Sequence, residues 1–306
     1  MLRHPLTGTL LAALAPAAYL LLCAGGGALL GYPLLLALHG SMPLHVLIGR
    51  CSQGLLFLGM WPITRRAGLR ASDFGFPARL GAFFKQVGLG FGLGAAMLGL
   101  HALALLLLDI RVVNPERIAS AAGVQRFALN ALLTGFAVAF LEEPLFRGFL
   151  LGSLAKAMPK FAAVAVCSLY FAVLHFLKTG IRPEFAEVQW YTGFPVAFDA
   201  FTHLFQRIQF DSFLALFGGG VLLCLVRLMR PGNLGYCVGM HAGWVFVIKF
   251  TRSLTKGNPN ESLGVLVGGY DGVIGYLSAS WIAVLIVLLW VSNRTARPIN
   301  SESRFG

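Results

Sequence analysis

Two adjacent glutamates and an arginine lie inside an apolar stretch of the chain, in the segment Phe140-Leu-Glu-Glu-Pro-Leu-Phe-Arg147. Charged groups at bilayer depth are energetically costly, so they are functional candidates wherever they occur. Arg147 follows Glu143 by four residues and shares its helical face, which predicts an ion pair. Glu142 points about 100° away from Glu143 and faces a different partner, and Pro144 loosens the helix here by removing one backbone hydrogen bond. A structural Glu143–Arg147 bridge alone would leave Glu142 unexplained.

Two histidines lie in other apolar stretches at comparable depth. His175 ends Phe171-Ala-Val-Leu-His, and His241 begins His-Ala-Gly-Trp-Val245. Counted from the expected cytoplasmic ends at about 1.5 Å per residue, Glu142 and the two histidines lie roughly 9 to 21 Å deep. Helix tilt of about 20° absorbs this scatter, so one carboxylate and two imidazoles can meet in one cavity. A third intramembrane histidine, His101, is interpreted as a packing residue.

The set of Glu142, His175 and His241 suits two kinds of chemistry. One carboxylate and two imidazoles are ligands that zinc accepts, with a fourth position open for water. Zinc would lower the pKa of that water to about 7 and supply a nucleophile. Without a metal, a buried Glu142 could activate water as a general base, and a histidine could hold the developing oxyanion. Both routes end in peptide hydrolysis, and the sequence leaves the choice open.

The elements that must position these residues are membrane helices. The chain has 306 residues, of which 57% are hydrophobic and 12% are charged, whereas a soluble domain carries about 25% charged residues. A span needs about 20 apolar residues. We therefore predict an all-α, polytopic transmembrane helix bundle that forms a single domain over 1–306, with catalytic core helices over 127–250. The predicted spans are 8–37, 44–62, 83–108, 127–152, 161–177, 212–229, 235–254 and 273–292.

The net charge of +12 does not indicate nucleic-acid binding, because the basic residues punctuate the ends of apolar stretches. This distribution is typical of positive-inside loops that face an anionic lipid surface. It predicts a cell membrane protein, of the bacterial inner membrane, with both termini in the cytoplasm. The basic residues placed inside are Arg65, Arg66, Arg70, Lys156, Lys160, Arg227, Arg230 and the C-terminal arginines.

Two further patterns concern the surroundings of the site. The connector 178–211 is predicted to be extracytoplasmic, and within it Phe198, Phe201 and Phe205 recur at helical spacing, which predicts a helix lying at the membrane interface. Gly235, Gly239 and Gly243 recur every four residues on the seventh span. Small residues let helix backbones approach closely in lipid, and His241 points away from this stripe.

The order of the motifs resembles the CAAX protease and bacteriocin-processing (CPBP, or Abi) family of membrane peptidases. The matching motifs are Glu142-Glu143-x-x-x-Arg147, Phe171-x-x-x-His175 and His241. The resemblance implies an eight-helix core and an intramembrane endopeptidase acting on a membrane-associated protein or peptide. It also implies that Glu142 is the catalytic base or a metal ligand. The family often has Asn or Asp four residues after the second histidine, whereas this chain has Val245, and Asn233 or Trp244 is conceivable as its replacement.

Two other functions fit parts of the pattern. A non-catalytic membrane scaffold or immunity-type protein would keep the fold without the chemistry, and Val245 favours this interpretation. A transporter with a Glu/His proton relay would show inverted repeats with interrupted helices in matching halves. The sequence has no such symmetry, and its intramembrane acids lie in one segment only. We therefore favour the peptidase, with Glu143 and Arg147 supporting Glu142, His175 and His241.

Overall fold

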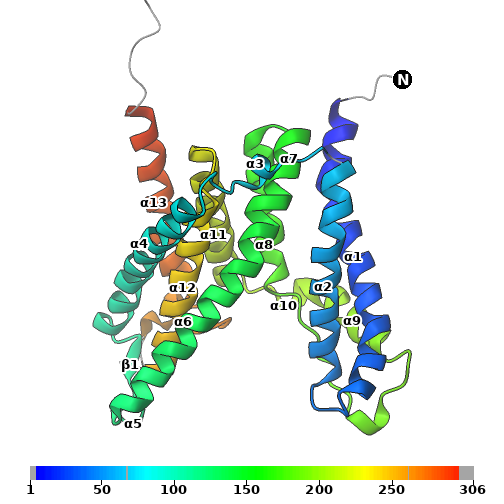
Figure 1. Cartoon of the computed structure of the whole chain (residues 1–306). Coiled ribbons are helices and arrows are strands. Elements are labelled where there is room, and N and C mark those ends of the chain that lie inside the picture. Colours follow the sequence, from blue (N-terminus) through cyan, green and yellow to red (C-terminus); the bar gives the residue numbers. More distant parts are fainter. Residues whose placement is uncertain (1–4, 67, 261, 296–306) are drawn as a thin grey trace, which may run out of the picture.

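The computed structural model describes residues 5–66, 68–260 and 262–295, and within these ranges long helices occupy every predicted span (Figure 1). The long helices are α1 (Pro5–Ala37), α2 (Leu44–Arg66), α4 (Leu80–Leu107), α6 (Ala121–Glu143), α8 (Lys160–Leu174), α11 (Phe210–Met229), α12 (Leu234–Leu254) and α13 (Tyr276–Thr295). The prediction of an all-α bundle is therefore confirmed.

Short elements connect the long helices. Two strands, β1 (Arg111–Val113) and β2 (Thr255–Gly257), pair antiparallel, with Arg111 opposite Gly257. The sequence did not predict this ribbon, which joins the end of α4 to the end of α12. The short helices are α3 (Ala71–Phe74), α5 (Pro115–Ile118), η1 (Pro144–Leu150), α7 (Leu151–Ala157), η2 (Phe185–Glu187), α9 (Gly193–Thr202), α10 (Leu204–Arg207) and η3 (Ser262–Leu266).

Five helical stretches within the described ranges are long and apolar enough to cross a membrane. They are Gly8–Ala37, Leu44–Arg66, Leu80–Leu107, Ala121–Ala157 and Phe210–Met229, and α8 and α13 supply shorter apolar helices. These stretches indicate an integral membrane protein. The remaining predicted span, α12, lies at the centre of the bundle, where α4 and α6 cover it.

Close backbone packing holds α12 in this central position. A Cβ atom on Gly239 would lie 2.1 Å from the carbonyl oxygen of Val87, and one on Gly243 would lie 2.6 Å from that of Phe91. On the facing helix, a Cβ on Gly94 would lie 2.3 Å from the carbonyl oxygen of Met240. Only glycine permits this approach, so the stripe predicted from the sequence is confirmed as the contact between α12 and α4. His241 lies on a different face of α12.

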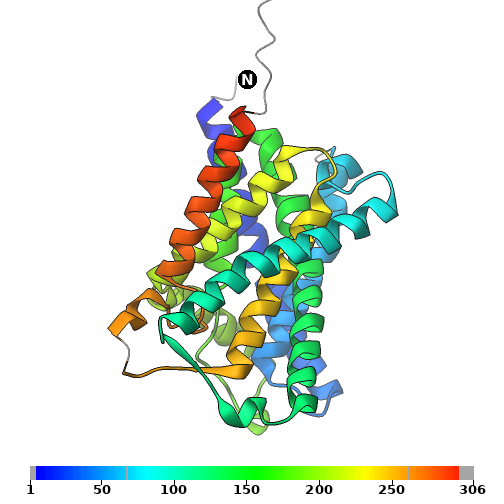
Figure 2. The same cartoon turned by 90° about the vertical axis from the view of Figure 1, so that its left-hand side faces the viewer.

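The start of α1 and the end of α13 lie at the same end of the bundle (Figures 1 and 2). The basic ends of α2 and α11 lie at that end as well, in agreement with an even number of crossings (Figure 1). The C-terminal Arg297 and Arg304 lie outside the described residues. The pair α1 and α2 stands to one side of the other helices, in contact with α9 and α7.

The connector 178–211 contains α9 and α10 rather than one continuous helix, because the chain breaks at His203. Val196 of α9 is buried against the α1 and α2 pair, whereas Phe198 is 69% exposed and Phe205 is 81% exposed. Asp199 of α9 ties the start of the connector to α10, since its Oδ2 accepts hydrogen bonds from the Gly180 amide at 2.7 Å and from Arg207 at 2.9 Å.

Candidate active site

A π-helical turn places the two glutamates and the arginine. The α-helix α6 ends at Glu143, and the wider π-helical turn η1 begins at Pro144. Proline has no amide hydrogen to continue the α-helical pattern, and π-turns inside helices recur at functional sites. Arg147 remains close enough to Glu143 for an ion pair of 3.0 Å between Nη1 and Oε1. The prediction that the two adjacent glutamates face different partners is confirmed, because Glu143 pairs with Arg147 and Glu142 does not.

Glu143 lies at the centre of a buried cluster that joins two helices. Its Oε1 accepts hydrogen bonds from Arg147 Nη1 and, at 2.7 Å, from Nδ1 of His241 on α12. Glu143 and Arg147 are fully buried, and His241 is 4% exposed. The Arg147 guanidinium also lies 4.2 Å from the centre of the Phe171 ring, so α8 closes the cluster. Uncompensated charges this deep would be strongly destabilising, and the pairing offsets part of that cost. Oε2 of Glu143 and Nε of Arg147 are left buried without a partner among the described residues.

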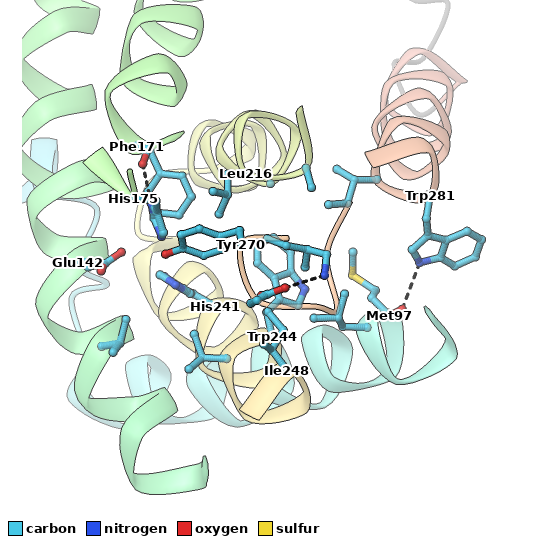
Figure 3. Close-up of a pocket in the computed structure, with 18 of the residues that line it drawn as sticks. Met97, Glu142, Phe171, His175, Leu216, His241, Trp244, Ile248, Tyr270 and Trp281 are labelled. Atoms are coloured by element: carbon cyan, nitrogen blue, oxygen red, sulfur yellow. Dashed lines mark hydrogen bonds between the residues drawn. The ribbon is translucent and has the colours of Figure 1, made fainter. Parts of the chain in front are cut away.

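Beside this cluster lies a cavity of about 330 Å³ lined by residues of α4, α6, α8, α11, α12, α13 and the loop before α13 (Figure 3). Glu142, His175 and His241 all line it. The Oε2 atom of Glu142 is buried without a hydrogen-bond partner among the described residues. A buried carboxylate oxygen left without a partner is expensive in a membrane interior, so this atom is the strongest indication of chemistry in the cavity.

The two imidazoles present the same nitrogen to the cavity. Nδ1 of His175 lies 2.7 Å from the carbonyl oxygen of Phe171, and Nδ1 of His241 contacts the Glu143 carboxylate. A carbonyl and a carboxylate only accept hydrogen bonds, so each Nδ1 carries the hydrogen. In the neutral form, Nε2 of each ring is therefore a lone-pair acceptor.

Tyr270 is a cavity residue that the sequence analysis missed. It lies in the glycine-rich loop before α13, and its hydroxyl points toward Glu142 and His175 (Figure 3). Burial first, and then the nearby Asp271, raise the pKa of Tyr270 to about 12, so the phenol is protonated at neutral pH. No motif or spacing marks a single tyrosine in a loop, so the sequence alone gave no signal for it.

Three polar residues pin the loop that carries Tyr270. The Asp271 carboxylate accepts the amides of Val273 and Ile274, and Nη1 of the buried Arg111 donates to the Gly272 carbonyl oxygen at 2.5 Å. Nε2 of His101 lies 2.9 Å from the carbonyl oxygen of Val273. His101 is thus a packing residue, as predicted, but only one of its ring nitrogens is bonded, since its Nδ1 is buried without a partner among the described residues. The β1–β2 ribbon carries Arg111 and so anchors this loop.

The position where the family often has Asn or Asp also faces the cavity, and here it is Val245. The proposed replacement Asn233 is wrong, because it precedes α12, does not line the cavity, and donates from its Nδ2 to the Val226 carbonyl at 3.0 Å. Trp244 does line the cavity, with its ring against Gly219 of α11. An amide-type hydrogen-bonding residue is therefore missing from this position.

A zinc ion would take Nε2 of His175, Nε2 of His241 and an oxygen of Glu142. The tautomers suit this role, since metal-binding histidines usually donate their other nitrogen to a carbonyl or carboxylate. The geometry does not, because no three His, Cys, Asp or Glu side chains in the described ranges are placed closely enough together to hold a metal ion. The donors as arranged do not fit the ion, and zinc binding stays a prediction from the sequence.

The fold and this cavity define a polytopic helical membrane protein with a buried acid–histidine site. Residues 124–247 match the family model for Rce1-like type II CAAX prenyl endopeptidases. Over this segment the chain is similar to that family, and the resemblance seen in the motifs is confirmed for these residues. No curated protein and no solved structure matches the chain. The matched segment runs from α6 to α12, so it includes both histidines and ends before Tyr270.

Proposed function

We propose that this protein is an intramembrane endopeptidase that hydrolyses a peptide bond in a membrane-associated protein or peptide. The observation that carries the proposal is the unpartnered Oε2 of Glu142, buried in a cavity that His175 and His241 also line. Similarity to an endopeptidase family supports the same reaction class. A carboxylate held within reach of a water molecule and a substrate carbonyl is a general base for hydrolysis.

Glu142 takes a proton from water while the water oxygen attacks the carbonyl carbon of the scissile peptide. The carbonyl electrons move onto oxygen and give a tetrahedral oxyanion. When this intermediate collapses, the C–N bond breaks, and Glu142 returns its proton to the leaving nitrogen. The Nε2 acceptors of His175 and His241 orient the hydrogens of the attacking water.

Glu143 and Arg147 hold His241 in place rather than react. The carboxylate of Glu143 fixes the Nδ1 hydrogen of His241, and Arg147 balances its charge. This arrangement keeps the imidazole in one tautomer with Nε2 toward the cavity. Preorganisation of this kind matters because a misplacement of about 1 Å can lower the rate of an enzyme about 100-fold.

The substrate class follows from the family and from the location of the site. The family description names CAAX prenyl endopeptidases, so lipidated C-terminal tails are the first substrates to test. The cavity opens among membrane helices and is lined largely by apolar residues. A substrate whose lipid anchors it in the bilayer would reach this depth without leaving the membrane. We place the protein in a bacterial inner membrane with both termini cytoplasmic, because basic residues gather at the end of the bundle where α1 begins and α13 ends.

The test is cleavage of a quenched fluorescent CAAX-type peptide, farnesylated or unmodified, by purified protein in lipid nanodiscs that contain a chelator. We expect wild type to cleave the lipidated peptide, and Glu142→Gln to lose about 100- to 10,000-fold in kcat, since the general base is removed. Glu116→Gln, at an exposed position on α5, is the matched control. Wild-type activity in Glu142→Gln would contradict the mechanism.

Two other outcomes would redirect the proposal. Activity lost to the chelator and restored by zinc, with about one zinc per chain that His175→Ala and His241→Ala both lose, would establish the metal site predicted from the sequence. A folded wild type that cleaves neither peptide, together with a normal cellular phenotype for Glu142→Gln, would favour the non-catalytic scaffold.

A further inference from the structure

Peptide hydrolysis places negative charge on the former carbonyl oxygen, and catalysis requires a hydrogen-bond donor aimed at that oxygen. The three residues that the sequence places at the site do not provide one. Glu142 is an acceptor when ionised. The Nδ1 hydrogens of His175 and His241 are directed to Phe171 and Glu143, so their neutral rings present only Nε2 lone pairs to the cavity.

Few donors remain among the residues that line the cavity within the described ranges. Nε1 of Trp281 donates to the Met97 carbonyl at 3.1 Å, so that hydrogen is in use. Arg252 lies eleven residues beyond His241 on α12, which is about 16 Å along the helix axis. Two candidates are left, the Tyr270 hydroxyl and the Trp244 indole, and Figure 3 shows Tyr270 on the side of Glu142 with its hydroxyl directed at the histidines.

The ring of Tyr270 is held from two sides by the segment that follows His175. Phe176 packs edge-on against it with ring centres 5.3 Å apart, and Nζ of Lys178 lies 4.2 Å from its centre. The His175 ring itself lies 6.4 Å away. The loop backbone is fixed by Arg111 and Asp271 as described above. Tyr270 is therefore a fixed donor, and the residues that hold its ring, Phe176 and Lys178, belong to the same segment as His175.

We propose that the Tyr270 hydroxyl donates a hydrogen bond to the tetrahedral oxyanion during peptide hydrolysis, in a cavity where Val245 offers no donor. The inference rests on the proposed function and adds a catalytic residue from outside the segment that matches the family. No proton is transferred in this role, because the phenol keeps its hydrogen while the oxyanion forms and collapses. The same cavity then contains Glu142, which accepts the proton of the attacking water, and Tyr270, which donates a hydrogen bond to the oxyanion.

The first arm of the test measures cleavage of the farnesylated fluorescent peptide. We expect Tyr270→Phe to lower kcat about 100-fold, as for the loss of one oxyanion donor, and to change KM by less than about threefold. Phenylalanine keeps the contacts with Phe176 and Lys178, so the thermal unfolding temperature should not change. Tyr191→Phe, 53% exposed on the connector, is the matched control. A larger loss in Trp244→Phe than in Tyr270→Phe would assign the donor to the indole and overturn the proposal.

The second arm does not require turnover. A phosphinate analogue of the peptide carries the tetrahedral, anionic oxygen that Tyr270 is proposed to bind, and its affinity is measured with a chelator present. We expect Tyr270→Phe to bind the phosphinate about 100-fold more weakly than wild type and to bind the uncleaved amide peptide equally well. Equal affinity of both proteins for the phosphinate, or no binding by wild type, would overturn the inference. Phosphinate binding that depends on Tyr270 in a protein that cleaves no peptide would keep the donor and reject the peptidase.

Discussion

Nδ1 of His241 lies 2.7 Å from Oε1 of Glu143, and both side chains are buried between α6 and α12. The same oxygen accepts a hydrogen bond from Arg147, so one carboxylate sets the orientation of the histidine and carries a balancing charge. The position of His241 toward the cavity thus depends on an ion pair whose two residues do not line the cavity. The chemistry of the site and the stability of the bundle are linked at this point.

Removal of Arg147 should destabilise the protein through Glu143. Arg147→Met fills a similar volume and leaves the carboxylate buried and unpaired, which we expect to reduce stability by about 3 to 5 kcal/mol. The double variant Glu143→Gln/Arg147→Met removes both charges and keeps an amide oxygen for His241. It should recover most of the lost stability, because a neutral pair has no charge to bury. Thermal unfolding in one detergent compares the three proteins.

The matched control is Lys156→Met, which breaks the half-exposed bridge between Lys156 and Asp73 on the surface. A surface pair contributes about 0 to 1 kcal/mol, so its loss should hardly change the unfolding temperature. Equal stability of Arg147→Met and wild type would mean that the Glu143 charge is neutralised in another way, and the account of the cluster would be wrong.

The backbone contact between α4 and α12 should be similarly sensitive. The Cβ of Gly239→Ala would lie 2.1 Å from the Val87 carbonyl oxygen, so the two helices must separate. Overpacking of this kind destabilises by about 1 to 3 kcal/mol. Gly239 is also two residues from His241, so peptide cleavage should fall with the unfolding temperature. Gly88→Ala is the control, because its Cβ would meet nothing within 4 Å. Equal effects of the two substitutions would contradict the packing argument.

Much of the architecture is predictable from the sequence because the bilayer fixes the length and polarity of a span. Every predicted span falls on a helix, and the limits agree closely where a charge or a turn ends the helix, as at Ala37 and Leu254. The geometry of the helix also predicts that the neighbouring residues Glu142 and Glu143 face different partners. The weakest prediction is the connector 178–211, where the helical spacing of the phenylalanines does not reveal the break at His203.

The rest of the site was not predictable because tertiary structure creates it. The sequence shows that His241 lies near the glutamates in depth, yet only the packing of α12 on α6 decides that it bonds to Glu143. Tyr270 enters the cavity on a loop whose course is set by Arg111, a residue 159 positions earlier in the chain. A loop tyrosine has neither periodicity nor a motif, so no pattern marks it.

Asp199 links the connector to the site and gives a prediction about pH. Its carboxylate accepts hydrogen bonds from Gly180, Thr179 and Arg207, and these lower the pKa of Asp199 to about 2, with the Gly180 amide the largest cause. A lowered pKa means that the ionised form stabilises the fold. Its contribution is complete above the ordinary pKa of 3.8 and is lost as the pH falls toward about 2. Between pH 5 and pH 8 it should be constant.

We therefore expect Asp199→Asn to loosen residues 178–181 equally at pH 5 and pH 8. Hydrogen exchange of this segment, corrected for the intrinsic rate at each pH, should be faster than in wild type by about the same factor at both values. Nδ1 of His203 also contacts the Asp199 carboxylate, at 2.8 Å, so the comparison is repeated in a His203→Gln background. An Asp199 effect that changes with pH even in that background would contradict the argument.

Arg207 also binds the carbonyl of Lys178, whose ammonium lies over the Tyr270 ring. Peptide cleavage by Asp199→Asn should consequently fall severalfold, because the loosened segment supports both His175 and Tyr270.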